Sequence, residues 1–495
     1  MTNIWNKFSR RGFLKGAAGS TVAATAGGGA MAAVAGHETY KLTREVPVER
    51  GYDVIVAGGG PSGAAAAICA ARLGAKVLLL EAVGSMGGMG TNALVSNWYS
   101  LSDGEKLIIG GLIKELIDTM CRNRETSPGA YENFEKGKLV GSLGFNPEAL
   151  KLLLDKLCKD AGVEVRFFTR VIDVDADRSK SRVNGVITSN VEGYRYIAAK
   201  TFIDCTGDAV LADLCGVKSR AAGKDTKDIM PPTLCAVLSD LDYDQFKKGQ
   251  TQEAMIEKAI AEDYFTQADR HVPGIFRSGA TTAIMNAGHL FHTNSLDCRS
   301  LSDGMAKGRL LVQEYAGFFR KYMKGCANMQ VLATGTLLGI RESRRIVGEY
   351  ELNYQDFKAR RHFADDIAIY SKGVDIHVYD LSPEEYKRYY EEFTSLDKLK
   401  KGENYGIPYG ILVPKGWTNL WVGGRCTSAD IKVNGAIRDQ PACSMMGQAA
   451  GTAAVQSIRT GQPACDLNTA QLVETLRKAG ANLPQQTLSK RMTRA

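Results

Sequence analysis

Residues 52–81 constrain the fold of this chain more than any other stretch, because they spell out a strand, a glycine-rich turn, a helix and a second strand in that order. The apolar run 53–57 predicts the first strand, and the turn at 58–63 leads into an alanine-rich helix predicted over 64–73. The second strand, predicted over 76–80, ends at Glu81. This order predicts a nucleotide-binding βαβ unit, and therefore an α/β fold with a Rossmann-like domain.

The turn residues have predicted roles at the phosphates of a dinucleotide. Gly58 permits the tight turn, Gly60 lets the backbone approach a pyrophosphate, and Gly63 lets the helix pack closely on the strand. The helix start, at Pro61 and Ser62, directs its free N–H groups and its positive end toward the phosphates.

The acid at the end of the second strand is the predicted ribose ligand, since Glu81 lies 18 residues beyond Gly63. This unit alone leaves NAD and FAD open. A second glycine-rich loop follows the acid and contains Gly87, Gly88 and Met89. NAD dehydrogenases do not require such a loop. In flavoproteins of the glutathione-reductase type a similar loop runs beside the long FAD molecule, so FAD is favoured.

The N-terminus resembles a twin-arginine export signal, with Arg10 and Arg11 before a weakly apolar Ala/Gly run that reaches about residue 36. Residues 1–35 are the predicted signal peptide. The run is glycine-rich and modestly hydrophobic, which suits a membrane span poorly, although retention as an N-terminal anchor stays open. The expected location is the periplasm, and the twin-arginine translocase is the expected export partner.

Charge and cysteine usage narrow the class of protein. The formal net charge is +8, but residues 1–35 carry four basic residues and no acid, so the rest holds 58 basic and 54 acidic residues, a net +4. That balance predicts no nucleic-acid partner. The 11 cysteines show no CxxC or clustered Cys/His spacing, so zinc, iron–sulfur and c-type haem sites are not expected, and no metal is predicted.

The pattern predicts a discontinuous cofactor domain interrupted by a second domain. The first part covers 50–230 and includes a helix from Pro147 to Ala161 and a strand that ends at Cys205-Thr206-Gly207-Asp208. From 231 to 401 the chain becomes rich in tyrosine and acidic helices and holds five of the six histidines, which predicts an inserted α+β substrate domain. Residues 402–460 return to the first domain, and 461–495 form a C-terminal helix and tail.

Five motifs in this order resemble the FAD-dependent oxidoreductase family loosely labelled "xanthan lyase-like", within the glutathione-reductase-type flavoproteins. They are the two glycine loops, the Thr206–Asp208 turn, the segment 339–345 and the C-terminal block 419–451. The resemblance implies bound FAD. It places Val171 beside the adenine, with Gly207 and Asp208 near the pyrophosphate and Thr206 beside them.

The C-terminal block departs from the family pattern at one position. Gly424 and Arg425 stand where many relatives have Gly-Asp, whose acid binds ribityl hydroxyls, so Arg425 is expected to face phosphate instead. A helix predicted over 441–457 would point its N-terminus at the flavin and stabilise the negative charge of the reduced form. Arg438, just before that helix, is a predicted contact to the flavin or to an anionic substrate, with a structural salt bridge as the alternative.

Candidate substrate residues lie in 231–401. Arg341 is a candidate clamp for a carboxylate or a hydroxyl-rich substrate, with an interdomain ion-pair network as the alternative. Oxidation at carbon needs a base while hydride leaves, and His377, His289 and His292 are the candidates. For each, a purely structural role is the alternative.

The expected function is therefore an FAD-dependent oxidoreductase that oxidises a polar small molecule, a sugar or hydroxy acid, by hydride transfer to flavin N5. A separate electron acceptor is expected: a quinone, a cytochrome or oxygen. Two alternatives remain at this stage. One is a flavin-dependent C=C (enoate) reductase fed by a partner cytochrome, and the other is a non-catalytic electron-transfer flavoprotein.

Overall fold

The computed structural model describes residues 40–138, 141–226, 228–249, 251–392 and 397–484. The predicted signal peptide, 1–35, lies outside the described residues. The described residues from 45 onward form one compact unit, which contains the helices and strands described below. Among the described residues, none of the helices combines the length and apolar character needed to cross a bilayer.

The first layer is a seven-stranded sheet built on the predicted βαβ unit. The strand order is β5-β2-β1-β8-β7-β6, and β17 also pairs with β8. Strands β5, β2, β1, β8 and β17 run parallel, whereas β7 is antiparallel to both β8 and β6. The bounds are β1 (Val48–Ala57), β2 (Val77–Leu80), β5 (Glu164–Arg166), β6 (Arg170–Asp177), β7 (Arg182–Asn190), β8 (Gly193–Asp204) and β17 (Leu420–Val422).

Both faces of this sheet are covered. Val54 and Val56 of β1 belong to one buried apolar cluster, and Ile55 and Ala57 belong to another. Alternate residues of a strand point to opposite faces, so the two clusters lie on the two sides of the sheet. Burial of both faces explains why the central strands are continuous apolar runs without alternation.

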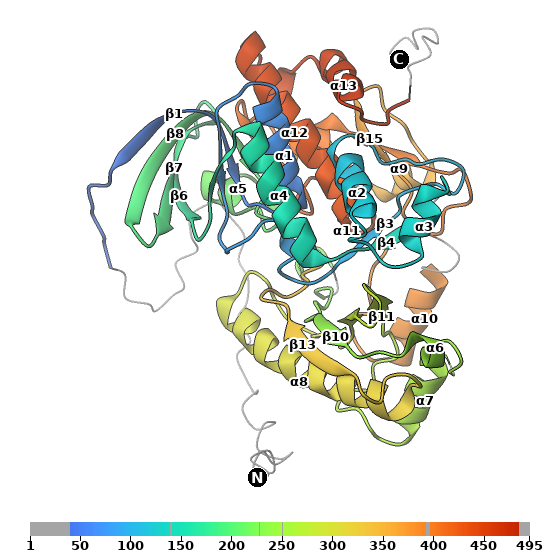
Figure 1. Ribbon diagram of the computed structural model, residues 1–495. Coiled ribbons are helices and arrows are strands. Elements are labelled where there is room, and N and C mark those ends of the chain that lie inside the picture. The colour runs from blue at the N-terminus through green and yellow to red at the C-terminus, as the bar shows by residue number, and fades with distance from the viewer. Residues whose placement is uncertain (1–39, 139–140, 227, 250, 393–396, 485–495) are drawn as a thin grey trace. The chain divides into compact units, whose positions relative to one another are not determined.

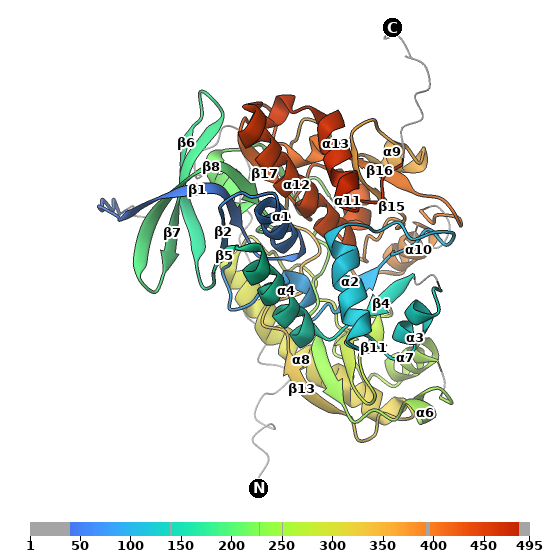
Figure 2. The same ribbon diagram turned by 45° about the horizontal axis from the view of Figure 1, so that its top comes forward.

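Two helices from opposite ends of the sequence pack side by side on the sheet: α1 (Pro61–Arg72) and α12 (Gln440–Thr460), as Figures 1 and 2 show. A Cβ on Gly447 would lie 2.0 Å from the carbonyl oxygen of Ser62, and one on Gly451 would lie 2.3 Å from that of Ala66. The close packing predicted from the small residues of α12 is therefore present, and it returns the C-terminal block to the glycine-rich turn.

The second layer is a four-stranded antiparallel sheet in the order β11-β12-β10-β13, seen in the lower half of Figure 1 with α8 against it. Its apolar cluster runs from Leu234 to Leu338 and includes residues of α8 that are completely buried. The bounds are β10 (Ala236–Ser239), β11 (Gly274–Arg277), β12 (Ala283–Asn286), β13 (Gln330–Thr334), α6 (Tyr243–Phe246), α7 (Gln252–Ala261) and α8 (Cys298–Tyr322).

The chain rejoins the first layer earlier than the predicted boundary at 401. β15 (Asp366–Tyr370) is buried at every position and pairs with β16 (Tyr405–Pro408), so one strand lies on each side of that boundary. Leu352 and Phe357 also pack into the cluster that holds α1 and α12. The core of the second layer thus closes near residue 340.

Short elements complete the unit. They are β3 (Asn97–Tyr99), β4 (Ser142–Gly144), β9 (Ser219–Ala221), β14 (Arg344–Ile346), α2 (Leu112–Arg122), α3 (Ala130–Glu135), α4 (Pro147–Ala161), α5 (Val210–Cys215), α9 (Tyr354–Lys358), α10 (Pro383–Glu391), α11 (Ile431–Ile437) and α13 (Thr469–Lys478).

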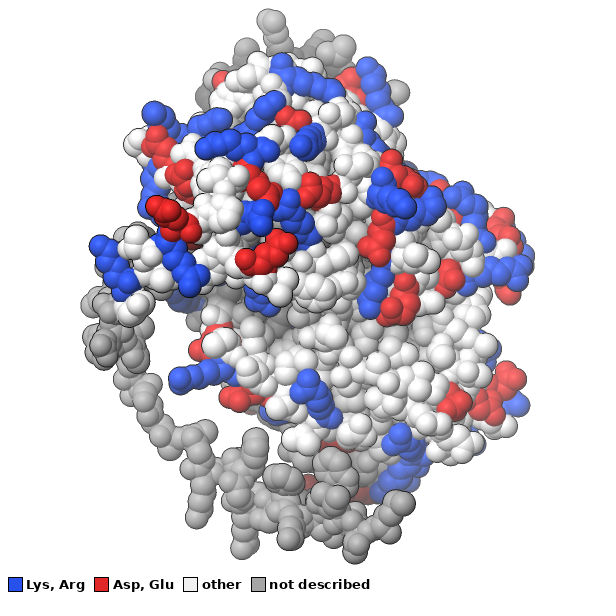
Figure 3. Space-filling model, turned by 60° about the vertical axis from the view of Figure 1, so that its left-hand side comes forward, with Lys and Arg blue, Asp and Glu red and all other residues white. Residues whose placement is uncertain are grey.

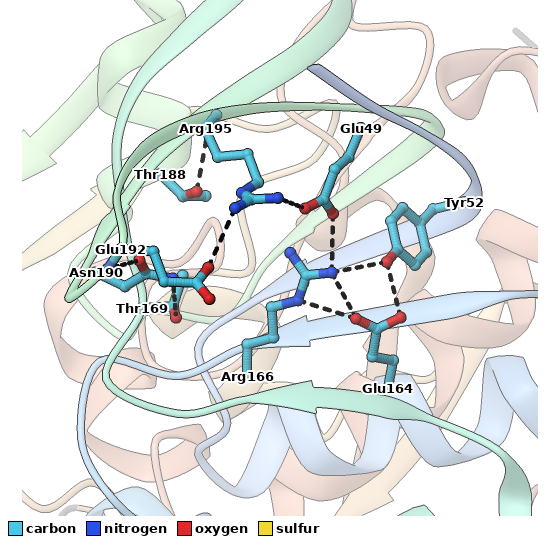
Figure 4. Close-up of polar contacts among 9 residues, drawn as sticks. All are labelled: Glu49, Tyr52, Glu164, Arg166, Thr169, Thr188, Asn190, Glu192 and Arg195. Carbon is cyan, nitrogen blue, oxygen red and sulfur yellow. Dashed lines mark hydrogen bonds and ion pairs between the residues drawn. The ribbon is translucent and has the colours of Figure 1, made fainter. Parts of the chain in front are cut away.

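The outer part of the first sheet carries an ion-pair network that joins β1, β5 and β8 (Figure 4). The Arg166 guanidinium lies 2.8 Å from Glu49 and 2.6 Å from Glu164, and Arg195 lies 2.6 Å from Glu49. These side chains are partly exposed, so each pair contributes about 0–1 kcal/mol. Figure 3 shows acidic and basic side chains interspersed over the upper part of one face.

Candidate functional site

One continuous cavity of about 1570 Å³ runs from the glycine-rich turn before α1 to a histidine cluster beside the second sheet. Typical small-molecule pockets measure roughly 300–1,000 Å³, so the cavity has room for a dinucleotide and a second molecule. Its walls include the predicted cofactor residues Gly58, Gly60, Pro61, Ser62, Glu81, Gly88, Met89, Val171, Thr206, Gly207, Asp208, Gly424, Arg425 and Arg438.

The glycines of the turn fall into two kinds. Gly58 has φ +93°, and a Cβ on it would lie 2.5 Å from the Cys205 carbonyl oxygen. A Cβ on Gly63 would lie 1.7 Å from the Gly58 oxygen. A Cβ on Gly60 would meet no protein atom within 4 Å. Gly58 and Gly63 are therefore required by packing, whereas Gly60 keeps space open on the cavity side.

Glu81 connects the two glycine loops. Its Oε2 accepts a hydrogen bond from the Gly59 N–H at 2.6 Å, and its Oε1 accepts one from Val83 N–H at 2.9 Å. Burial raises the pKa of Glu81 even though these N–H groups favour the carboxylate. Each oxygen has a further lone pair, so the carboxylate can hold the turn in shape and still accept a bond from a ribose.

The second loop packs against the first through its backbone. Gly87, with φ +94°, donates its N–H to the Gly59 oxygen at 2.9 Å. A Cβ on Gly88 would lie 2.9 Å from the Gly60 Cα. Gly87 is therefore a packing residue, while Gly88 and Met89 line the cavity.

The turn after β8 is organised by a buried acid. Asp204 Oδ1 accepts bonds from the Thr206 N–H at 3.0 Å and the Thr206 hydroxyl at 2.7 Å, and its Oδ2 accepts one from Ala212 N–H at 2.9 Å. These bonds hold Thr206 and Gly207, which has φ +78°, at the cavity wall.

Arg425 forms an ion pair across that turn. Its Nη2 lies 2.6 Å from Asp208 Oδ1, and its Nη1 donates to the Ile340 oxygen at 3.3 Å. The Nε is buried and has no partner among the described residues. Arg425 is thus paired with an acid from a distant part of the chain, at the turn after β8.

This end of the cavity fits the FAD that the sequence predicts. The open side of Gly60 leaves room for a pyrophosphate, and no side chain caps the N-terminus of α1, so its first N–H groups are available to phosphate oxygens. The N-terminus of α12 also lacks a side-chain cap, and it borders the cavity at Asp439 and Gln440. A helix N-terminus there suits the negative charge of a reduced flavin.

A buried charge cluster lies beside the start of α12. The Lys372 ammonium is 3.0 Å from Asp375 and 2.9 Å from Asp439, and Arg438 Nη2 is 3.3 Å from Asp375. Burial opposes the charge of Lys372, but the two carboxylates outweigh it and raise its pKa. Burial likewise opposes the charge of Asp375, yet Lys372 and Arg438 hold its pKa well below the usual range. Arg438 therefore forms a salt bridge and also lines the cavity.

The opposite end of the cavity holds three histidines that are far apart in sequence. His289 Nδ1 lies 2.8 Å from Asp269 Oδ2, and its Nε2 lies 2.9 Å from Nδ1 of His377. His377 Nε2 faces Asp375 Oδ1 at 3.5 Å. Nε2 of the third imidazole, His271, is hydrogen-bonded to the Tyr389 hydroxyl at 2.9 Å. His271 and His377 line the cavity.

Burial keeps the imidazoles of His271 and His377 uncharged. Desolvation and the neighbouring His289 lower the pKa of His271 to about 3. Desolvation, with Arg341 close by, holds the pKa of His377 well below its usual value. Burial works against ionised Asp269, but His289 and Tyr386 keep its pKa below the usual range. At neutral pH the cluster thus offers neutral imidazoles at His271 and His377 and an ionised carboxylate at Asp269.

The other two predicted substrate residues differ in their placement. Arg341 is buried, lines the cavity, and is held by the Pro231 carbonyl and by the Thr233 hydroxyl at 3.2 Å. Burial and nearby Arg438 lower its pKa to about 10, so it remains charged at neutral pH. The side chain of His292 is 69% exposed and lies 2.7 Å from Asp228. The structure therefore places His292 outside the cavity wall, apart from His377 and Arg341.

The sequence spacing predicts no metal site, yet one ring nitrogen each of His271, His289 and His377 lies within 4.8 Å of the others. Nitrogen ligands about 2.1 Å from a tetrahedral zinc ion are about 3.4 Å apart. In this structure one pair is hydrogen-bonded at 2.9 Å. The observed geometry is that of a hydrogen-bonded cluster.

Several residues of this end were not predicted from the sequence: His271, Asp269, Tyr386, Tyr389 and Lys372. No local spacing marks them, because they come from the loops around β11 and β15 and from α10. The one available signal was the concentration of histidines in residues 231–401, which indicated the region without the pairing.

Comparison with known proteins identifies the family. The family model described as FAD dependent oxidoreductase matches residues 53–476. A urocanate reductase of Eggerthella lenta is 33% identical over 112 residues, a match that covers 19% of this chain and 18% of the reductase. This chain thus matches less than a fifth of the length of that relative.

Solved structures to which this chain is similar include a geranylgeranyl bacteriochlorophyll reductase-like protein from Thermoplasma acidophilum. It has a TM-score of 0.41 at 13% identity, over 87% of this chain and 84% of that one. The myxobacterial chondrochloren halogenase CndH has a TM-score of 0.42 at 13% identity, over 88% and 79% of the two chains. The family match extends over both layers and the whole glycine-rich cradle. The chain belongs to the FAD-dependent oxidoreductase family, is an enzyme, and uses FAD as its cofactor.

Proposed function

We propose that this enzyme oxidises a polar small molecule, a sugar or hydroxy acid, at a carbon that bears a hydroxyl group. The observation that carries the proposal is the continuity of the cavity, which joins the dinucleotide cradle to an end lined by Arg341, His377 and Arg438. Bound FAD supplies an acceptor, at flavin N5, for the hydride that leaves the carbon.

The polar end suits a substrate with oxygen ligands. Arg341 presents a charged guanidinium whose position is fixed by Thr233 and Pro231. A fixed guanidinium binds a carboxylate or a pair of hydroxyls with two parallel hydrogen bonds. In the proposed complex Arg341 anchors the substrate and Arg438 adds positive charge near the flavin. His377, neutral and at the wall, accepts the hydroxyl proton.

Electrons leave the enzyme through a separate acceptor in this proposal: a quinone, a cytochrome or oxygen. The proposed location is the periplasm, reached through the twin-arginine translocase, and it rests on Arg10, Arg11 and the Ala/Gly run that follows them. Free NAD(P)H is not expected there, so rapid turnover with NADH and no artificial acceptor would count against the proposal.

A second candidate function is reduction of a C=C bond in an enoate, with electrons from a partner cytochrome. It is favoured by the local match to the urocanate reductase and by the two arginines at the polar end, which suit a carboxylate. The residues that bind substrate would be the same, and only the direction of electron flow would differ.

An anaerobic test separates the two candidates. The purified FAD-loaded protein is mixed with sugars, hydroxy acids and enoates while the flavin absorbance is followed. Bleaching by a hydroxyl compound supports oxidation, whereas reoxidation of a chemically reduced flavin by an enoate supports the reductase. An Arg341→Lys variant keeps the charge but loses the planar fork, so it should weaken substrate binding more than it slows flavin reduction at saturation.

A further inference from the structure

Four side chains near the substrate end form a linear array: Asp269, His289, His377 and Asp375. Its three contacts are Asp269 Oδ2 to His289 Nδ1 at 2.8 Å, His289 Nε2 to His377 Nδ1 at 2.9 Å, and His377 Nε2 to Asp375 Oδ1 at 3.5 Å. Both imidazoles and Asp269 are buried.

With one N–H on each imidazole, the array is one proton short. Each of the three contacts needs one hydrogen between its two heavy atoms, but two imidazoles with one N–H each supply only two. Asp269 is ionised and accepts only, so His289 must donate from Nδ1. Its Nε2 then holds a lone pair, and His377 must donate from Nδ1. The remaining nitrogen, His377 Nε2, carries a lone pair toward Asp375.

The distances agree with this assignment. The two contacts that receive a hydrogen are 2.8 and 2.9 Å, within the normal range for hydrogen bonds, whereas the third is 3.5 Å and too long for one. His377 lines the cavity, while His289 and Asp269 do not. The free lone pair therefore belongs to the imidazole of the array that a substrate can reach, and Asp375, which also lines the cavity, faces it.

We propose that Nε2 of His377 is the atom that takes the substrate's hydroxyl proton, and that His289 and Asp269 are positioning residues that fix its tautomer. This inference rests on the proposed oxidation. In the step, the O–H proton moves to Nε2 and the C–H hydride, with its two electrons, passes to the oxidised flavin as C=O forms. The new N–H then fills the third contact, to Asp375.

The charged groups around His377 determine how stable its protonated form is. Asp375 attracts the proton, whereas burial and the charges of Arg341 and Arg438 oppose a positive charge on His377. Lys372 neutralises part of the charge of Asp375 at 3.0 Å, and the Tyr389 hydroxyl is occupied with His271. Protonation of His377 is thus transient, which a base that must reset after each turnover requires.

The first test reads the tautomers directly, without a substrate. Histidine ring nitrogens are labelled in the FAD-loaded protein, and two-bond nitrogen–proton couplings report which nitrogen carries hydrogen. There are six histidines in the chain, and signals are assigned with His289→Gln and His377→Gln. The expected result is an N–H at Nδ1 of both residues. An N–H at Nε2 of neutral His377 would overturn the proposal.

The second test changes which ring nitrogen of His289 and of His377 carries the hydrogen. Asp269→Asn offers an amide donor to His289 Nδ1, so both imidazoles should switch to Nε2–H and the lone pair of His377 should leave the contact with Asp375. Flavin reduction by a substrate found with wild type should fall by about 10²–10⁴-fold. The matched control is Tyr386→Phe, which removes a different hydrogen bond to Asp269, at 2.9 Å, and should leave the tautomers unchanged.

The proposed oxidation and the proposed roles of His289 and Asp269 can be disproved separately. A wild-type enzyme whose flavin is reduced by no hydroxyl compound would overturn the proposed function and the proton-accepting role with it. An Asp269→Asn variant that keeps wild-type tautomers, or that reduces its flavin at the wild-type rate, would overturn the array alone.

Discussion

Nε2 of His289 lies 2.9 Å from Nδ1 of His377, although 88 residues separate them in the chain. His289 follows β12 of the second sheet, and His377 follows β15, which packs on the first. The pair therefore joins the two layers at the end of the cavity where a substrate is proposed to bind. Any shift between the layers would disturb this contact.

Enlarging Gly60 should release FAD without unfolding the protein. Gly60 has φ −65° and ψ −173°, which any residue adopts, and a Cβ would meet no protein atom within 4 Å. We expect Gly60→Val to weaken FAD retention by roughly tenfold or more, about 1.4 kcal/mol. The measurement is the ratio of flavin to protein after dialysis, together with the denaturation midpoint of the flavin-free form.

The matched variant for this test is Gly63→Ala, whose Cβ would lie 1.7 Å from the Gly58 oxygen. It should lower the denaturation midpoint of the flavin-free protein, which Gly60→Val should not. Full flavin retention by Gly60→Val would show that the pyrophosphate does not pass this residue.

The Arg425–Asp208 ion pair should couple energetically. The pair is 2.6 Å apart, with side-chain exposures of 10% and 30%. Arg425→Met and Asp208→Asn should each destabilise the FAD-loaded protein. Both substitutions remove the same contact. The loss of unfolding free energy in the double variant should therefore be about 1 kcal/mol smaller than the sum of the losses in the two single variants. Denaturant unfolding of the four proteins measures the coupling, and strictly additive losses would show that the pair contributes nothing.

Ionisation of Glu342 should lower the free energy of unfolding as pH rises. Burial raises its pKa from 4.5 to about 7, although the Met230 N–H and Arg345 oppose the shift. A folded-state pKa above the unfolded value means that the stabilising effect is complete below pH 4.5. It is lost as pH rises toward 7, by an amount on the order of 3 kcal/mol.

Glu342→Gln removes the ionisation but keeps an oxygen to accept from Met230. The variant should therefore be more stable than wild type at pH 8, with little difference at pH 4.5. Unfolding free energies at both pH values measure this, and Glu115→Gln, at a solvent-exposed ion pair with Arg72, is the control. An equal difference at both pH values would contradict a raised pKa.

Local sequence signals were sufficient for the cofactor half of the molecule. The βαβ unit forms where the strand, glycine turn and acid predict it, and the helix predicted from Pro147 to Ala161 has those bounds. These elements depend on contacts close in sequence or on glycines whose φ and packing admit no other residue. The close packing of α12 on α1 was also readable, because small residues at Gly447 and Gly451 permit it.

The substrate half depends on contacts between distant segments, which a single sequence does not show. The protein partner of Arg425 is Asp208, 217 residues away. Of the candidate bases, His377 and His289 meet in space while His292 lies at the surface with Asp228. The predicted boundary at 401 divides β15 from β16, because a buried apolar strand does not reveal which partner it pairs with.

The central claim is that the cavity is an oxidation site in which His377 accepts the proton. The most direct measurement is the anaerobic rate at which hydroxy acids and sugars bleach the bound flavin in wild type, in His377→Gln and in His292→Gln. We expect at least one hydroxyl compound to reduce the wild-type flavin. His377→Gln should slow that reduction by about 100-fold or more, and His292→Gln should match wild type. Reduction at the wild-type rate in His377→Gln would contradict the account.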